Sequence, residues 1–262
     1  SDLGLVGVNP RYVPTGHLVY GHTTQVLMAA PFDLATHRLT GDPSTVLPEV
    51  MVVVGGATQF AVSETGTAVY ALPPGDDNAS FQLAIVDLNG VETPLALGGG
   101  FFRHPRFSPS GRHIAYEAID RISVFDLEAG DNPTLAIGVT DNPWWSRDGR
   151  YVYFSGRTNS TLFSDGLRRL ADGSEEAEHL FRRDGMNYPQ SMSPDGSQIL
   201  VMESTLDRGY DLVIMSEDGD SVSFTDYLRA DWNETMATIS PDGARAAYVA
   251  DEFGVPEVYI RS

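Results

Sequence analysis

Two amino acids are missing from this chain of 262 residues. It contains no cysteine, which excludes disulfide frameworks, zinc–thiolate sites and cysteine nucleophiles, and which leaves the redox compartment open. It also contains no lysine, so its 17 basic residues are all arginine, against 36 acidic residues. The net charge of −19 argues against a nucleic-acid partner, because affinity for nucleic acids rests on basic side chains that neutralise phosphates.

Long apolar runs are absent as well. The longest candidate, residues 48–61, is interrupted by Gly55 and Gly56 and falls short of the roughly 18 residues that a membrane span requires. We therefore expect no membrane span in this chain, and its first residues do not open a basic signal-peptide region. With 42% hydrophobic and 20% charged residues, the composition is that of a folded globular domain.

One short phrase recurs along the whole chain. Its four close copies are Phe107–Gly111, Trp145–Gly149, Met192–Gly196 and Ile239–Gly243, and two weaker copies are Val62–Gly66 and Val13–Gly16. The steps between successive glycines of the phrase are 50, 45, 38, 47 and 47 residues. A period near 45 is typical of one four-stranded blade of a β-propeller.

The phrase predicts a tight turn followed by a buried strand. Proline presets φ, the Ser or Asp side chain caps the turn, and glycine accepts positive φ. A continuous apolar run follows each glycine, as in Ile114–Tyr116, and such runs suit strands that are buried on both faces. The repeated aspartates Asp148, Asp195 and Asp242 are therefore interpreted as structural turn residues rather than as a catalytic set.

Six such units predict a single all-β domain over residues 1–262, a six-bladed propeller with four-stranded antiparallel blades. The predicted blades are 9–56, 57–101, 102–139, 140–185, 186–233 and 234–262, the last completed by a strand over 3–8. The sixth unit lacks a fourth strand, so we expect residues 3–8 to pair with the strand near Val258–Arg261 and close the ring. The alternative is that the chain is part of a longer propeller.

The Ser-Pro-Asp-Gly phrases resemble the TolB-type, WD40-like propeller repeats of bacteria. The opening stretch, residues 11–20 with Ala30–Leu34 and Thr40-Gly41, is similar to propeller domains attached to bacterial serine/threonine kinases. No kinase motif is present in this sequence. The resemblance implies a propeller fold, a sensing or interaction role, and a periplasmic or extracellular location.

Motifs for catalysis are missing. The sequence has no Gly-x-Ser-x-Gly elbow, no His-Glu-x-x-His pair and no phosphate-binding loop. Three acidic stretches, Asp76–Asn78, Glu175–Glu178 and Asp207–Asp211, lack the spacing of a calcium loop and are interpreted as solvated surface.

A mouth of the axial channel is the candidate binding surface, because the starts of the innermost strands converge there. Counting seven back from each turn glycine gives Asn9, Gln59, His104, Asn142, Pro189 and Met236. With their polar neighbours, the candidate ligand-binding residues are Arg103, His104, Asp141, Asn142, Asn187, Tyr188 and Glu234. This set suits a small polar ligand or a peptide, or a Ca²⁺ ion held by carboxylate and amide oxygens. A channel that holds only water is the alternative.

Tryptophans also lie near the predicted axis. Trp144 and Trp145 point to opposite faces of one strand, so we expect Trp145 between blades and Trp144 toward the channel or an adjoining sheet. Trp232 suits a binding rim or a buried loop anchor.

The leading functional hypothesis is a non-catalytic module that binds a protein, a peptide or a small polar ligand, with no cofactor expected. One alternative is a calcium-dependent hydrolase, similar to propeller lactonases or phosphoesterases. Another is a propeller that gates a catalytic domain elsewhere in a multidomain enzyme.

Overall fold

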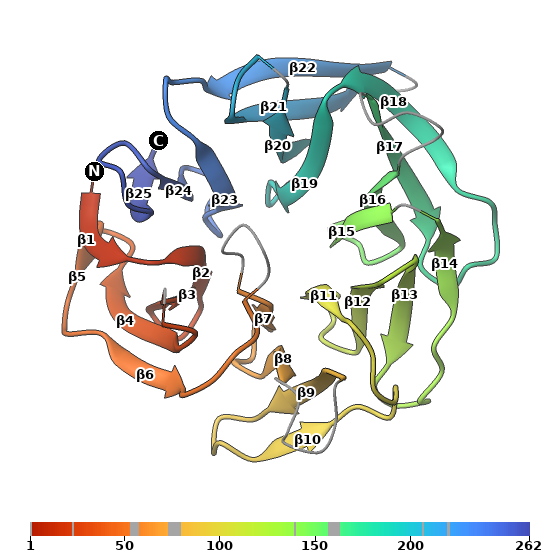
Figure 1. Cartoon of the computed structure of the whole chain (residues 1–262), viewed down its shortest axis with the longest axis horizontal. Coiled ribbons are helices and arrows are strands. Elements are labelled where there is room, and N and C mark those ends of the chain that lie inside the picture. The colour runs from red at the N-terminus through yellow and green to blue at the C-terminus, as the bar shows by residue number, and fades with distance from the viewer. Residues whose placement is uncertain are drawn as a thin grey trace.

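The structure, a computed structural model, describes residues 2–22, 24–52, 58–72, 80–138, 140–156, 163–205, 207–218 and 221–262. These residues form antiparallel sheets and, within the described part, no helix. Six sheets stand around a central axis as the blades of a propeller (Figure 1). The predicted all-β, six-bladed fold is confirmed.

Strands follow one another outward from the axis within each blade. The innermost strands are β2 (Val8–Val13), β7 (Phe60–Val62), β11 (Arg103–Phe107), β15 (Thr140–Trp145), β19 (Met186–Met192) and β23 (Glu234–Ile239). The second strands are β3 (His17–Gly21), β8 (Ala68–Leu72), β12 (His113–Ala118), β16 (Tyr151–Gly156), β20 (Gln198–Ser204) and β24 (Ala246–Ala250). The third strands are β4 (Leu27–Asp33), β9 (Gln82–Val86), β13 (Arg121–Asp126), β17 (Phe163–Leu170), β21 (Tyr210–Asp218) and β25 (Glu257–Arg261).

The outer edges of the blades are more exposed. Outer strands are β10 (Glu92–Pro94), β14 (Thr134–Ile137), β18 (Glu178–Asp184), β22 (Ser221–Leu228) and β1 (Asp2–Val6). In the first blade, both β5 (Arg38–Leu39) and β6 (Ser44–Leu47) pair with β4.

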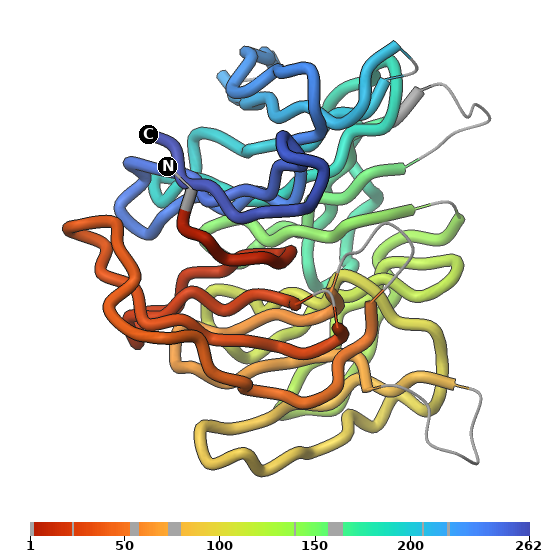
Figure 2. The backbone as a smooth tube through the Cα atoms, turned by 60° about the vertical axis from the view of Figure 1, so that its left-hand side comes forward, coloured from red at the N-terminus to blue at the C-terminus, as the bar shows by residue number. Residues whose placement is uncertain are grey.

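The N-terminal strand closes the ring. β1 pairs antiparallel with β25, with Asp2 opposite Tyr259 and Val6 opposite Glu257, so the two ends of the chain share one blade (Figure 2). The strand expected over 3–8 ends at Val6, and β2 of the first blade begins only two residues later. Gly7 marks this crossing, because a Cβ there would lie 2.5 Å from the Tyr20 ring.

The recurring phrase folds as the predicted turn. In the fifth blade the Ser193 hydroxyl donates a hydrogen bond to Asp195 at 2.6 Å. The same Asp195 oxygen accepts the N–H of Ser197 at 3.1 Å, and Gly196 has a φ of 76°. The fourth blade repeats the arrangement, with Asp148 accepting a hydrogen bond from a serine hydroxyl at 2.6 Å. Asp148 and Asp195 thus cap their turns, as the sequence predicts.

Apolar clusters fill the spaces between neighbouring blades. In the described residues there is one such cluster at each of the six blade interfaces, for example Ala115, Val124, Trp145 and Phe154 between the third and fourth blades. The second strands pack against a cluster on each face, which explains their continuous apolar sequences. Trp145 is buried between blades, as predicted.

Candidate functional site

A bulge shapes the start of most innermost strands. Asn9, His104, Asn142 and Met236 have φ values of 54°, 49°, 54° and 55°, although left-handed backbone is uncommon for residues other than glycine. The strand register shifts at each of these four positions. A β-bulge turns a side chain away from the regular alternation of a strand. The bulge therefore lies at the same position in four of the repeats, and it determines the direction of the side chains at this end of the channel.

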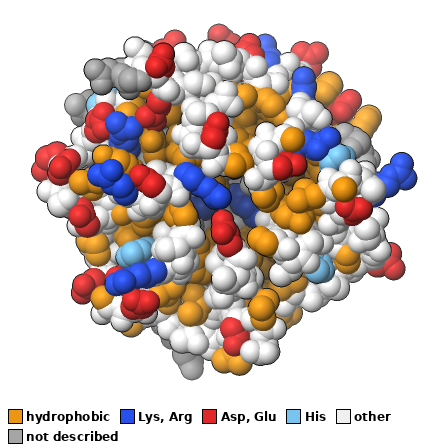
Figure 3. All heavy atoms as spheres, turned by 180° about the vertical axis from the view of Figure 1, so that it is seen from behind, with side chains coloured by type: hydrophobic (Ala, Val, Ile, Leu, Met, Phe, Trp, Pro, Cys, Tyr) orange, Lys and Arg blue, Asp and Glu red, His pale blue; other side chains and the backbone are white. Residues whose placement is uncertain are grey.

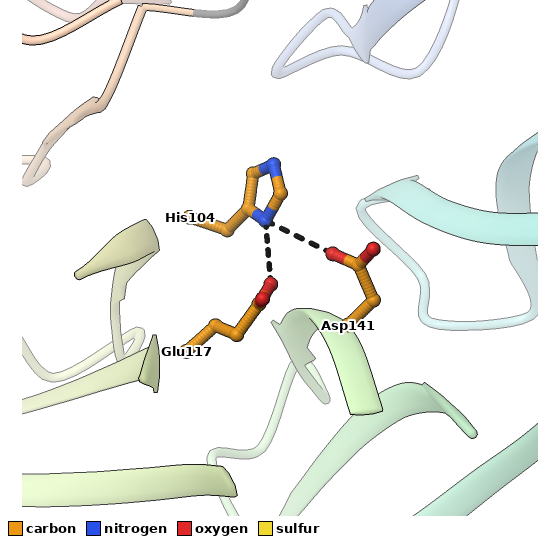
Figure 4. Close-up of side chains that lie close together, drawn as sticks. All are labelled: His104, Glu117 and Asp141. Carbon is orange, nitrogen blue, oxygen red and sulfur yellow. Dashed lines mark hydrogen bonds and ion pairs between the residues drawn. The ribbon is translucent and has the colours of Figure 1, made fainter. Parts of the chain in front are cut away.

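Three side chains from two blades meet at this end of the channel. His104 of β11 places its Nδ1 atom 3.0 Å from Oε2 of Glu117 and 3.2 Å from Oδ1 of Asp141 (Figure 4). Glu117 belongs to β12 and is completely buried, whereas the His104 and Asp141 side chains are 19% and 21% exposed. The second ring nitrogen of His104 points away from both carboxylates (Figure 4). A buried glutamate thus holds a histidine whose outer nitrogen faces away from its supports.

Charge is nearly balanced within this cluster. Arg103 forms an ion pair with Glu117, whose pKa burial raises above its usual value. Burial would lower the pKa of His104, but its hydrogen bonds to Asp141 and Glu117 outweigh burial and raise it. Burial acts to raise the pKa of Asp141, yet the hydrogen bond with His104 lowers it well below its usual value. The result is a favoured His104–Asp141 ion pair beside a carboxyl group that retains its proton more readily than usual.

Hydrogen bonds between blades fix the backbone around this cluster. The N–H of His104 donates to the side chain of Gln59 in the preceding blade at 2.5 Å. The N–H of Asn142 donates to Glu117 at 3.4 Å, and the Asn142 amide donates to the carbonyl of Pro189 in the next blade. Asn142 is 2% exposed, so its side chain joins neighbouring blades.

The other predicted ligand residues make contacts of their own. Asn187 is fully buried and donates to the Asp184 carbonyl at 3.3 Å, while the Tyr188 hydroxyl contacts the Met186 sulfur at 2.7 Å. Glu234 is 0% exposed, and its carboxylate forms no ion pair in the described part of the chain. The structure thus groups Arg103, His104 and Asp141, and joins Asn142 to them through Glu117. That all seven predicted residues form one ligand site remains a prediction.

In the acidic stretch Asp207–Asp211, residues 207–210 are exposed as expected, but Asp211 is not. Asp211 is 3% exposed and pairs with Arg208 at 3.0 Å and with Arg229 at 3.3 Å. Arg229 also pairs with buried Glu203 at 2.6 Å. Arginines cover these carboxylates where β21 begins, so the prediction for Asp211 was wrong. The stretch Asp76–Asn78 lies outside the described residues.

Comparison with known proteins shows which propellers the chain is similar to. No protein-family model matches the chain. The Tol-Pal system protein TolB of Francisella tularensis subsp. tularensis (strain WY96-3418) is 28% identical over 128 residues, which cover 47% of this chain and 28% of that protein. The structure of TolB from Acinetobacter baumannii superposes with a TM-score of 0.63 over 94% of this chain and 65% of that one, at 14% identity. The chain is a β-propeller that is similar to TolB.

Other relations of this TolB-like propeller concern its fold alone. An oligogalacturonate lyase in complex with manganese superposes with a TM-score of 0.63 at 15% identity, over 96% of this chain and 75% of that one. The aligned part of the chain corresponds to less than a third of the length of the curated TolB relative. Among the described residues, none forms a helix of the length and apolarity needed to cross a bilayer.

Sequence reasoning missed Glu117, the residue that organises the cluster. It directly follows the apolar run Ile114–Tyr116 on a strand buried on both faces. A charged residue on such a strand is more informative than any apolar one, because burial of a charge requires a partner. Its cross-strand neighbour in the sheet is Arg103. A charged residue within an otherwise largely apolar strand was therefore the feature of the sequence that could have identified Glu117.

Proposed function

We propose that this TolB-like propeller is a non-catalytic binding module that takes a protein or peptide at the channel mouth around His104 and Asp141. One observation carries the proposal: these two partly exposed polar groups are fixed from behind by buried Glu117. Groups held in place before binding lose little conformational freedom when a partner arrives. The curated relative, named as a Tol-Pal system protein, supports a role in protein interaction.

The chemistry of the mouth suits a polypeptide. Arg103 and His104 supply donors, and Asp141 supplies an acceptor, within one cluster. A peptide backbone presents both donors and acceptors and can satisfy such a mixture. A periplasmic or extracellular location is part of the proposal, on the resemblance to TolB-type repeats.

The proposal is tested with peptides selected from a displayed library against the intact chain. Affinities of a selected peptide are measured by calorimetry for the wild type, His104→Ala and Asp141→Asn. Loss of a charged hydrogen-bond partner should weaken binding about tenfold or more. His179→Gln is the matched control, because His179 lies on outer strand β18, and Arg182 still pairs with its partner Asp165. Unchanged affinity in both mouth variants would exclude this surface.

A metal-dependent function is the second candidate, supported by a separate observation. His104, Glu117 and Asp141 each offer one ligand atom, and these atoms lie within 4.8 Å of one another. A nitrogen ligand favours an ion such as Mn²⁺ over the proposed Ca²⁺, which prefers oxygen ligands. Arg103 opposes this function, because its charge already pairs with Glu117 and would repel a cation.

Calorimetric titration with Mn²⁺ and with Ca²⁺ separates the two candidates. Metal binding that is lost in Asp141→Asn and retained in His179→Gln would support the metal centre. Peptide affinity that is unchanged by a chelator, together with no heat from either ion, would support the binding module.

A further inference from the structure

A pocket opens at the other end of the channel, where the repeated turns lie. Its volume is about 200 Å³, and it lies between the turns of the second, third and fourth blades. Figure 3 shows one face of the propeller with arginine side chains gathered at its hollowed centre. The residues that line the pocket and matter here are Arg11, Arg106, Phe107, Trp144, Arg147 and Met192. The pocket is distinct from the cluster around His104, which lies at the start of the same inner strands.

Two arginines in this pocket occupy equivalent places in the repeat. Arg11 and Arg106 each stand five residues before their turn glycine, and each follows a proline. Each guanidinium donates to the carbonyl of the preceding proline, at 3.0 Å for Arg11 and 2.9 Å for Arg106. The same position in the fourth blade is Trp144. The guanidinium carbons lie 6.0 Å (Arg11) and 5.1 Å (Arg106) from the centre of its ring.

Neither guanidinium has a carboxylate partner in the described part of the chain. Arg106 is only 6% exposed, and its Nε atom is buried without a hydrogen-bond partner. Burial lowers the pKa of Arg11 to about 10 and, together with the charge of Arg11, that of Arg106 well below its usual value. Glu64, the carboxylate at the rim, pairs instead with Arg147 at 3.5 Å. Two neighbouring cations, buried Arg106 and half-buried Arg11, thus have no counter-charge among the described residues.

This arrangement is unexpected in a chain of such charge. Acidic residues outnumber arginines by 36 to 17, and the buried carboxylates Glu117, Glu203 and Asp211 have arginine partners, whereas buried Glu234 forms no ion pair among the described residues. An unpaired buried charge is strongly unfavourable unless a ligand supplies the counter-charge. Contact with the face of an indole offsets only part of that cost.

We propose that the pocket binds an organic carboxylate and that the guanidinium groups of Arg11 and Arg106 bind this carboxylate jointly. Arginine presents parallel N–H donors that match the two oxygens of a carboxylate. Phe107, Trp144 and Met192 give the pocket an apolar wall, which favours an anion that carries a hydrocarbon group over an inorganic one. The carboxylate belongs either to a small organic acid or to the end of a peptide chain.

Calorimetry on the intact chain tests the proposal at constant ionic strength in chloride buffer. The probes are acetate, N-acetyl-dialanine with a free carboxylate, the same dipeptide as its C-terminal amide, and inorganic phosphate. We expect both carboxylates to bind and the amide not to bind. Arg106→Gln should weaken carboxylate binding about tenfold to hundredfold, because one charge-assisted contact is lost. Arg121→Gln is the matched control, since Arg121 is half-exposed, lies on β13 and gives the same change of net charge.

The outcomes distinguish the sources of the carboxylate. Tighter binding of N-acetyl-dialanine than of acetate assigns the pocket to a peptide end, and the reverse assigns it to a small acid. Phosphate that binds more tightly than both carboxylates, or equal binding of acid and amide, overturns the proposal. So does the absence of binding by either carboxylate. If Arg106→Gln does not fold, Arg11→Gln replaces it, and carboxylate affinity that is unchanged in a folded variant also refutes the inference.

Discussion

Glu234 provides the sharpest test of the electrostatics of this propeller. Its carboxylate is fully buried at the start of β23 and forms no ion pair among the described residues. Burial and then the charge of Asp211 raise its pKa from 4.5 to about 7, although a hydrogen bond from the backbone of Ala230 and the charge of Arg208 act in the opposite direction. The folded state therefore keeps a proton on Glu234 between about pH 4.5 and 7, where the unfolded state has released it.

The sign and size of the effect follow from this difference. Because the native state binds more protons in this window, the contribution of Glu234 to stability falls as pH rises from about 4.5 to 7 and stays low above it. A pKa of about 7 in place of 4.5 corresponds to about 3 kcal/mol. Replacement by glutamine removes the ionisation and keeps the shape. Glu234→Gln should therefore match the wild type near pH 5 and exceed its free energy of unfolding by about 2 to 3 kcal/mol at pH 8.

Urea unfolding of both proteins at pH 5, 6, 7 and 8 measures this difference directly. Glu252→Gln in the same blade is the control, because Glu252 is exposed and its removal changes the net charge equally. The control should show no comparable growth of the difference with pH. A difference between Glu234→Gln and the wild type that stays constant from pH 5 to 8 would refute the reasoning.

Three further perturbations probe the architecture. Deletion of residues 1–6 exposes the edge of β25, and we expect a lower melting temperature and larger species in size-exclusion chromatography. Asp195→Ala should lower the free energy of unfolding by about 1 kcal/mol, since it removes a turn-capping acceptor, and should leave peptide affinity unchanged. Asp211→Asn should cost about 3 kcal/mol in urea unfolding, because it leaves Arg208 without its buried partner and removes one of the two buried partners of Arg229. Asp226→Asn removes an exposed ion pair and should lower the free energy of unfolding by less than about 1 kcal/mol. Equal losses for Asp211→Asn and Asp226→Asn would show that burial does not strengthen the contribution of these ion pairs to stability.

The fold was predictable because its signals are local and repeated. The turn around Asp195 requires an acceptor and a glycine at fixed positions, and each copy of the phrase specifies the same turn wherever it occurs. Ring closure by residues 2–6 followed from the missing strand of the sixth unit. The boundary between β1 and β2 at Gly7 could not be predicted, because it depends on how closely Tyr20 approaches the backbone.

The candidate site was only partly predictable, for a physical reason. Counting back from each turn glycine identified His104, because residues at the same position in each repeat lie at the same level along the channel axis. Whether side chains from blades one, three and four then touch depends on the width of the channel, which the sequence does not encode locally. Arg11, Arg106 and Trp144 share one offset, yet their contact appears only once the ring has closed.

The pairing of β1 with β25 also imposes an order on folding. The partners are separated by about 250 residues, so the last blade cannot form until residues 257–261 have been synthesised. Contacts of such long sequence separation form late, because the entropy of closing the loop has to be overcome first. Until then β1 and the edge of β25 are both unpaired and available to strands of other chains. The same junction that completes the ring is therefore where a newly made molecule is most exposed to misassembly.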